Sequence, residues 1–287
     1  MIQPLHLRAL SFEWPRVGGQ PGFLRLLRGE ARRCRDEGAQ LVLFPAFYGL
    51  TLLDGLESWA FGPGLPTAIA RRGGFLRETL ERAGASVAAE LGIYLSPGSF
   101  FVTADGGRGL RHVAQLFSPR GELVLEAAQV HVAPWERDWG LTGGDEFPVA
   151  ELPWGKLGFL IGTDAWYPEA GRILALQGAE LLLAPVATPA PYRGVMSLAG
   201  VWSQVQGNQV YGLEAGLWGE GGGLELTGQA GGFGPCELTG DGSGFLGAAF
   251  AADRKGLARV RESYPIFAHL NPNLYRRLLA EAWESLP

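Results

Sequence analysis

The chain has 287 residues, a formal net charge of −5, and 47% hydrophobic against 18% charged residues. This composition supports a large folded core and excludes an extended disordered chain. The acidic balance argues against nucleic acid or an anionic membrane surface as a partner. No apolar run approaches the roughly 20 residues of a membrane span, and the first ten residues lack a secretory signal pattern. We therefore expect a soluble cytoplasmic protein that folds as one domain over 1–287.

The residues that usually mark disulfides and metal sites are scarce. Two cysteines, Cys34 and Cys236, do not make a disulfide framework in a chain of this size. None of the four histidines shows a metal-binding spacing. The glycine run 219–223 lacks the strand–turn–helix context of a phosphate-binding loop. The sequence therefore predicts neither a metal nor a cofactor.

Strands and helices alternate in the first half of the chain. Residues 2–12 are apolar and partly alternate, which predicts a strand. A helix is expected over about 22–37, with its apolar residues on one face and Gly38 as its stop. Residues 41–44 are apolar on both faces, which indicates a strand covered on both sides. The pattern then predicts a helix over about 74–91 and strands over 93–102, 111–119 and 121–130.

The second half continues the same alternation. We expect a strand over 156–161, a helix over 168–177 and a buried strand over 179–184. The glycine-rich stretches 219–234 and 240–247 contain interspersed leucines and phenylalanines, which favours short strands with tight turns over a flexible linker. The chain ends in a helix from about Pro272, with Asn271 as its cap.

One segment of the chain has an internal echo. Residues 38–45, GAQLVLFP, are similar to residues 178–185, GAELLLAP. In both, a helix stop is followed by a buried strand and then a proline. Two such units suggest one sandwich with internal pseudosymmetry, although an eight-residue echo is also compatible with coincidence.

An ordered set of motifs indicates a family. Residues 155–169, GKLGFLIGTDAWYPE, resemble the nucleophile segment of the nitrilase, or carbon–nitrogen hydrolase, superfamily. Residues 41–46 resemble its strand ending in Phe-Pro-Glu, and 129–131 its Lys-x-His. Further similar segments follow at 144–149, 208–211, 264–267 and 272–275. Each block is weakly specific, but together they cover nearly the whole chain in the family's order.

The resemblance implies a four-layer α-β-β-α sandwich and a cysteine–glutamate–lysine mechanism. In that chemistry a thiolate attacks an amide or nitrile carbon, a glutamate moves protons, and an ammonium group stabilises the developing negative charge. This chain has Gly162 at the cysteine position, Ala46 at the glutamate position and Gln129 at the lysine position. None of the three can perform the family's role, so the resemblance predicts a catalytically inactive member.

Two nearby residues leave alternatives open. Glu136 matches a second glutamate that often follows the lysine in this family; the alternative is an exposed loop carboxylate beside Arg137. Thr163 has a hydroxyl next to Gly162, but we expect it to point away from the site, with no base beside it. Cys34 lies on a buried helix face and Cys236 far from any motif, so neither indicates an activated thiol.

Two classes of function therefore remain. The first is a non-catalytic protein that binds a small molecule or has a structural role; the second is an amide or nitrile hydrolase with relocated catalytic residues. The missing side chains predict a neutral, roomier pocket for a small apolar or aromatic ligand. Its candidate walls are aromatic side chains that flank the three emptied positions; they are Phe47, Tyr48, Trp135, Trp139, Trp166 and Tyr167. Each of these rings, taken singly, is also explained as core or interface filler.

The resemblance further implies pairing of two copies. Family members commonly stack two sandwiches into a larger one. We expect the helix from Pro168 and the C-terminal tail, about 262–287, to form the contact of a homodimer.

Overall fold

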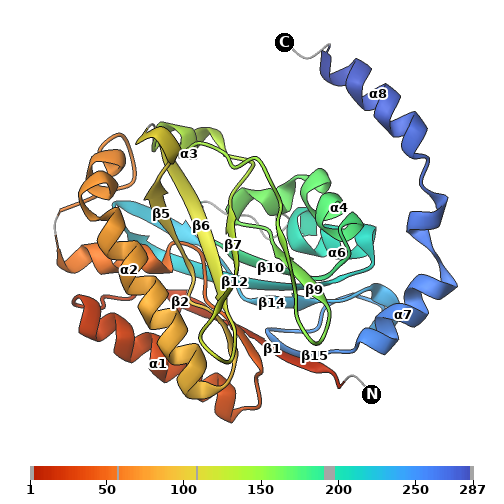
Figure 1. Ribbon diagram of the computed structural model, residues 1–287, viewed down its shortest axis with the longest axis horizontal. Helices are drawn as coiled ribbons and strands as arrows, with labels where there is room; N and C mark the ends of the chain where they lie inside the picture. Colours follow the sequence, from red (N-terminus) through yellow and green to blue (C-terminus); the bar gives the residue numbers. More distant parts are fainter. Residues whose placement is uncertain (1–2, 57, 108, 191–197, 285–287) are drawn as a thin grey trace.

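The computed structural model describes residues 3–56, 58–107, 109–190 and 198–284. Two mixed sheets lie face to face between helices, which is the α-β-β-α sandwich that the sequence predicted (Figure 1). Helices α1 (Gln20–Asp36) and α2 (Leu65–Leu91) cover one sheet, and α4 (Pro168–Leu176) and α6 (Ser203–Asn208) cover the other. No helix in the described ranges is long and apolar enough to cross a membrane.

The first sheet has seven strands in the order β15-β1-β3-β4-β6-β5, with β7 paired to β6. Its strands are β1 (Leu5–Ala9), β3 (Leu41–Leu43), β4 (Tyr94–Ser96), β5 (Ser99–Thr103), β6 (Leu110–Phe117), β7 (Leu123–Ala128) and β15 (Ala249–Ala252). The strand expected over 93–102 is divided into β4 and β5. Gly98, with a φ of +87°, makes the turn between them.

The second sheet has eight strands in the order β11-β13-β12-β10-β9-β8, and β2 and β14 also pair with β12. Its strands are β2 (Ser11–Glu13), β8 (Val149–Glu151), β9 (Lys156–Phe159), β10 (Ala179–Val186), β11 (Thr188–Pro189), β12 (Tyr211–Gly221), β13 (Leu224–Thr227) and β14 (Gly231–Phe233). The glycine-rich stretch 219–234 thus forms strands and turns, as predicted, whereas 240–247 forms turns with a single β-bridge at Phe245, so the prediction of strands there is wrong.

Alternation along the central strands builds three apolar layers. In β3, Leu41 and Leu43 face the core between the sheets, whereas Val42 faces α1 and α2. In β10, Leu181 and Leu183 face the same inter-sheet core, whereas Leu182 faces α4 and α6. β3 and β10 are the two echoed segments, and each has a parallel strand on both sides. The echo therefore corresponds to equivalent positions in the two sheets.

The remaining helices connect and extend the sandwich. A short α3 (Pro134–Asp138) follows β7, and α7 (Arg254–Ser263) follows β15. The last helix, α8 (Pro272–Glu284), leads away from the body of the molecule (Figure 1). Asn271 caps it, because its Oδ1 accepts a hydrogen bond from the N–H of Leu274 (3.1 Å).

Candidate functional site

The site is built where β7 and β9 end, and Gln129 lies at its centre. Gln129 follows β7 and is 1% exposed, and Gly162 follows β9. A Cβ atom placed on Gly162 would lie 3.3 Å from Oε1 of Gln129. Gly162 has a φ of +55°, a conformation that a residue with a side chain adopts only at a cost. Gln129 and Gly162 are therefore direct neighbours.

A chain of hydrogen bonds connects the end of β3 to Gln129. Ala46 is fully buried, and the N–H of the next residue, Phe47, donates to Oγ of Ser99 (3.0 Å). Ser99 Oγ lies 2.5 Å from Nε2 of His112, and Nδ1 of His112 lies 2.7 Å from Oε1 of Gln129. Every group is satisfied when His112 is neutral and its Nδ1–H donates to the amide oxygen. Burial lowers the pKa of His112 to about 4, which agrees with a neutral ring.

The amide nitrogen of Gln129 continues the chain to Glu136. Gln129 Nε2 donates to Oε2 of Glu136 (2.7 Å), and the N–H of Ala133 donates to the same oxygen (2.8 Å). The first turn of α3 directs this side chain inward, so that it is only 2% exposed. The alternative of an exposed loop carboxylate is therefore wrong. Burial raises the pKa of Glu136 to about 7, although the hydrogen bonds from Ala133 and Gln129 act in the opposite direction.

Thr163 does not point away from this cluster. Its Oγ1 accepts from Gln129 Nε2 (2.8 Å), lies 2.6 Å from the carbonyl oxygen of His131, and is 3.3 Å from Oε2 of Glu136. The expectation from strand alternation is wrong here because Gly162–Trp166 forms a 3₁₀ turn, to which a period of two does not apply. A carboxyl group therefore does lie beside the hydroxyl, but Thr163 is only 2% exposed.

Asp164 connects the segment after β7 to the segment after β9 through hydrogen bonds. Its carboxylate is 1% exposed and accepts hydrogen bonds from the backbone N–H groups of Val130 (3.1 Å) and His131 (2.7 Å). The same carboxylate lies 3.0 Å from Nδ1 of His131. These bonds hold the segment after β7 against the turn after β9, and so set the distance between Gln129 and Gly162.

The six aromatic candidates lie in separate places. Phe47, with a φ of +60°, stacks on His112 (4.8 Å between ring centroids) and contacts the Trp139 ring edge-on (6.2 Å). Tyr48 instead packs on Phe23 under α1. The other three lie nearer α4, where Trp135 meets Trp166 edge-on (6.2 Å) and Tyr167 stacks on His131 (4.0 Å). The rings do not surround a common space.

The space beside Gly162 is small. A cavity lined by Gly162 and Trp166 has a volume of about 20 Å³. Among the described residues this cavity has room for about one particle of the size of water, and the expected roomier pocket stays a prediction. Whether any of the six rings contacts a ligand stays a prediction.

One residue at this cavity was missed in the sequence. Glu214 of β12 also lines it and is 5% exposed. Burial raises the pKa of Glu214 to about 8. Residues 210–217 have the apolar pattern of a buried strand, and Glu214 is the single acidic residue among them. That exception is the signal that could have indicated an unusual site.

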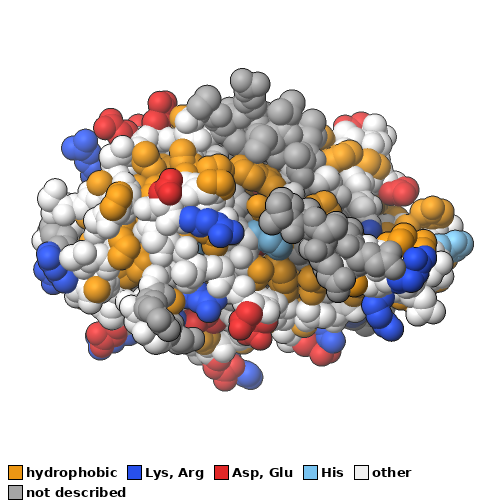
Figure 2. All heavy atoms as spheres, turned by 90° about the horizontal axis from the view of Figure 1, so that it is seen from above, with side chains coloured by type: hydrophobic (Ala, Val, Ile, Leu, Met, Phe, Trp, Pro, Cys, Tyr) orange, Lys and Arg blue, Asp and Glu red, His pale blue; other side chains and the backbone are white. Residues whose placement is uncertain are grey.

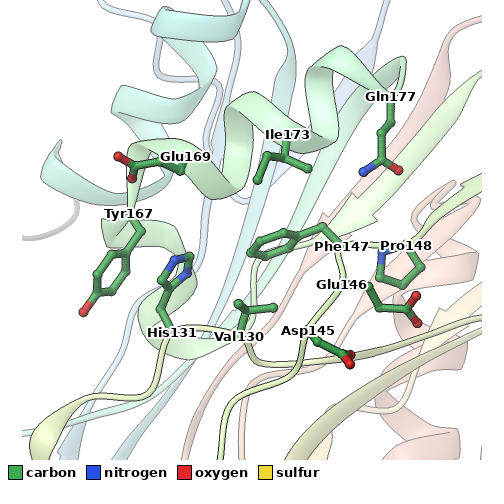
Figure 3. Close-up of a pocket in the computed structure, with 10 residues that line it drawn as sticks. All are labelled: Val130, His131, Asp145, Glu146, Phe147, Pro148, Tyr167, Glu169, Ile173 and Gln177. Atoms are coloured by element: carbon green, nitrogen blue, oxygen red, sulfur yellow. The ribbon is translucent and has the colours of Figure 1, made fainter. Parts of the chain in front are cut away.

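A larger groove of about 790 Å³ lies on the surface beside α4. Figure 3 shows Tyr167 next to His131, and Ile173 pointing from α4 toward Phe147. Acidic groups border it, because Asp145, Glu146 and Glu169 also line it. The groove adjoins the hydrogen-bond network of Gln129 at His131, which lines the groove and whose carbonyl oxygen accepts a hydrogen bond from Gln129 Nε2 (2.9 Å).

The cysteines and acidic residues offer no second centre in the described part of the chain. Cys34 is fully buried, and burial raises the pKa of its thiol, which disfavours the reactive thiolate. Cys236 is partly buried, in a short 3₁₀ turn. No group of three or more His, Cys, Asp or Glu side chains among the described residues is arranged to hold a metal ion.

Comparison with known proteins identifies the family. Residues 24–219 match the carbon–nitrogen hydrolase family, and the chain belongs to it. A hydrolase from the pqqF 5′ region of Pseudomonas protegens is 39% identical over 82 residues, which cover 28% of this chain and 29% of that protein. A nitrilase from Pyrococcus abyssi is 28% identical over 201 residues, which cover 69% of this chain and 70% of that protein. The match to the Pseudomonas hydrolase thus spans less than a third of its length.

Solved structures agree on the fold. A Cys-to-Ser mutant of the Nesterenkonia AN1 amidase, from the nitrilase superfamily, aligns with a TM-score of 0.67 and 22% identity. The alignment covers 94% of this chain and 98% of that one. At this identity the match establishes the sandwich architecture.

The Gln129 network makes a stability prediction. Replacing Gln129 with Leu removes the acceptor for His112 and one donor for Glu136, and leaves buried polar groups without partners. We expect the Gln129→Leu variant to lose about 1–3 kcal/mol of unfolding free energy, measured by urea denaturation. The exposed Gln229→Leu is the matched control and should change stability by less than about 0.5 kcal/mol. Equal stability of both variants would contradict a role for the network.

The buried Glu136 makes a prediction about pH. Its folded-state pKa, about 7, lies above the ordinary value of 4.5, so the folded protein holds this proton over a wider range. Its contribution to stability is therefore full below about pH 4.5 and is lost as the pH rises toward 7. We expect the stability of Glu136→Gln relative to wild type to improve by about 3 kcal/mol at most between pH 4.5 and 8. Denaturation at several pH values measures this, and the exposed Glu262→Gln should show no such trend. A difference between Glu136→Gln and wild type that is independent of pH would refute the assignment.

Proposed function

We propose that this chain is a non-catalytic member of the carbon–nitrogen hydrolase family that binds a small molecule. The main support for this proposal is that the side-chain amide of Gln129 is fully hydrogen-bonded within the protein. Its amide oxygen is engaged by His112 and its amide nitrogen by Glu136, Thr163 and the carbonyl of His131. Both ends of the group are thus occupied within the protein. A neutral amide in this position stabilises the fold and brings no positive charge to a reacting atom.

The neighbouring positions support the same proposal. A mutant of the Nesterenkonia amidase shows covalent addition of the acetamide moiety of fluoroacetamide at its active-site cysteine. Gly162, which the motif resemblance aligns with the family's cysteine, has no side chain to form such a bond. Ala46, aligned with the glutamate, has no group to accept a proton. When a whole catalytic unit is removed, enzymes retain only about 10³–10⁴-fold of acceleration over water.

The rival function, a hydrolase with relocated residues, would draw on Thr163 and Glu136. These two groups are within 3.3 Å of each other, which is the one feature in its favour. However, Thr163 Oγ1 is 2.6 Å from the carbonyl of His131, and both side chains are 2% exposed. The cavity beside Gly162 is lined by neither of them. A substrate would have no route to this hydroxyl through that cavity.

A hydrolysis panel tests the proposed function. Wild-type protein is incubated with small amides and nitriles, and acid formation is followed by chromatography. We expect acceleration no greater than about 10³–10⁴-fold over the uncatalysed rate. The variant Ala46→Glu/Gln129→Lys/Gly162→Cys should exceed wild type, and Gly162→Cys alone should not. Robust turnover by wild type, lost in Thr163→Val, would establish the rival function instead.

We also propose that two copies pair through α4 and the C-terminal segment. Apolar side chains are exposed on α4, at Ile173 (41%) and Leu176 (59%). Others are exposed on α8, which leaves the body of the molecule; they are Leu274, Tyr275, Leu278 and Leu279. Seen from above, hydrophobic side chains are exposed on the surface, and most acidic groups lie near its outline (Figure 2). A second copy would cover these apolar residues.

The oligomeric state tests this pairing. Light scattering should give about twice the chain mass of 30.8 kDa for wild type. Leu176→Glu places a charge on the proposed contact and should give the monomer mass. Leu123→Glu is the matched control, because Leu123 is similarly exposed (47%) but lies on β7, and should remain a dimer. A monomeric wild type at high concentration would overturn the pairing.

A further inference from the structure

Glu214 occupies a position where a carboxyl group is unexpected. In β12 its neighbours Leu213 and Ala215 face the core between the two sheets. Glu214 therefore faces the opposite side, beside Ala184 of β10, which belongs to the apolar layer under α4 and α6. A buried carboxylate is costly unless a partner compensates its charge. Its presence in this layer calls for such a partner.

The described protein does not supply that partner. Among residues 3–56, 58–107, 109–190 and 198–284, no group forms a hydrogen bond or ion pair with this carboxyl group. Burial raises the pKa of Glu214, and no donor or cation among the described residues opposes this effect. By contrast, Glu136 is buried to a similar extent and accepts hydrogen bonds from Ala133 and Gln129. Among the described residues, therefore, nothing pairs with the carboxyl group of Glu214, which lies at the wall of a cavity.

The cavity beside Glu214 offers hydrogen-bond acceptors. Its volume of about 20 Å³ has room for one particle of the size of water. Thr188 and Thr227 also line it, and each hydroxyl is directed at the other residue's carbonyl oxygen (3.3 and 3.4 Å). A hydroxyl that donates its hydrogen in this way presents lone pairs to the cavity. No Lys, Arg or His is among the described residues that line it.

We propose that this cavity binds a water-sized cation that donates hydrogen bonds, with Glu214 as its counter-ion. Ammonium, or the ammonium end of a small primary amine, has this chemistry because it carries N–H donors and no acceptor. The carboxylate compensates its charge, the threonine oxygens accept its hydrogens, and the Trp166 ring provides an aromatic surface to which cations are attracted. The proposal names the ligand class of the non-catalytic binding protein proposed above and rests on that function.

Thermal unfolding of the full chain at constant ionic strength is the first test. Ammonium and methylammonium chloride should each raise the Tm relative to sodium chloride, because a ligand that binds only the folded state stabilises it. Tetramethylammonium has no N–H donor and is too large, so it should match sodium. An effect of ammonium alone assigns the site to the free ion, and an equal effect of methylammonium extends it to amines. An equal effect of potassium would overturn the requirement for hydrogen-bond donation.

Variants localise the effect. Calorimetric titration with ammonium chloride should show binding at least about tenfold weaker in Glu214→Gln, which keeps the shape and removes the charge. Glu225→Gln is the matched control, because Glu225 lies exposed on the adjacent strand β13 and should bind as wild type does. Thr227→Val, with the carboxyl group intact, should weaken binding several-fold and serves where Glu214→Gln does not fold. Binding that is unchanged in both cavity variants would overturn the site.

Failure of this site and failure of the proposed function give different results. Amide turnover by wild type would refute the non-catalytic function without affecting ammonium binding. The absence of any ammonium effect on wild type, with no amide turnover, would refute the cation site alone.

Discussion

The carboxamide of Gln129 is the interaction on which the rest of this site depends. Its oxygen accepts from His112 on one side, and its nitrogen donates to Glu136 on the other. A lysine ammonium has donors but no acceptor, so it could not receive the hydrogen of His112 Nδ1. With a lysine here, His112 would have to adopt its other tautomer or lose a bond. The neutral amide therefore suits the neutral histidine, and the two residues fit each other as a pair.

The same constraint agrees with the burial of Gln129, His112 and Glu136. A charged group at position 129 would require a compensating carboxylate and the water or substrate that such charges attract. Gln129 requires only fixed polar neighbours, and Ser99, His112 and Glu136 provide them. Phe47 then stacks on His112 without leaving a charge beneath its ring. Neutral hydrogen bonds thus make the described surroundings of Gln129 part of the buried interior.

Much of the fold was predictable because the same pattern of a helix stop, a buried apolar strand and a proline occurs twice along the chain. The echo between 38–45 and 178–185 is produced by strands β3 and β10, whose side chains on one face meet in a single inter-sheet core. The helix stops at Gly38 and Gly178 both have φ near +95°, which glycine adopts readily. The proximity of Gln129 and Gly162 is what the family resemblance implied, because it aligns them with two residues of one mechanism. These are features that local pattern and chain order specify.

Other features required three-dimensional packing. Thr163 points inward because the chain forms a 3₁₀ turn after β9. The alternation of side chains along a strand does not predict this change of direction. The rings near the emptied positions adjoin one another in the sequence, as Phe47 and Tyr48 do, but successive residues in a turn point to different layers. Thus Phe47 packs on His112 while Tyr48 packs on Phe23. Proximity to a motif therefore did not predict a shared pocket.

The two buried glutamates, Glu136 and Glu214, differ in their hydrogen-bond partners, and this difference bears on whether the protein binds a ligand. Glu136 accepts bonds from Gln129 and Ala133, so its environment is complete without a ligand. Glu214 has the same burial and no such donors among the described residues, so its environment is not complete. If the protein had a purely structural role, an apolar residue at 214 would match Ala184 beside it and avoid the cost of desolvation. The presence of a carboxyl group in an apolar layer is therefore better explained by a ligand than by the fold, and it favours a binding function over a structural one.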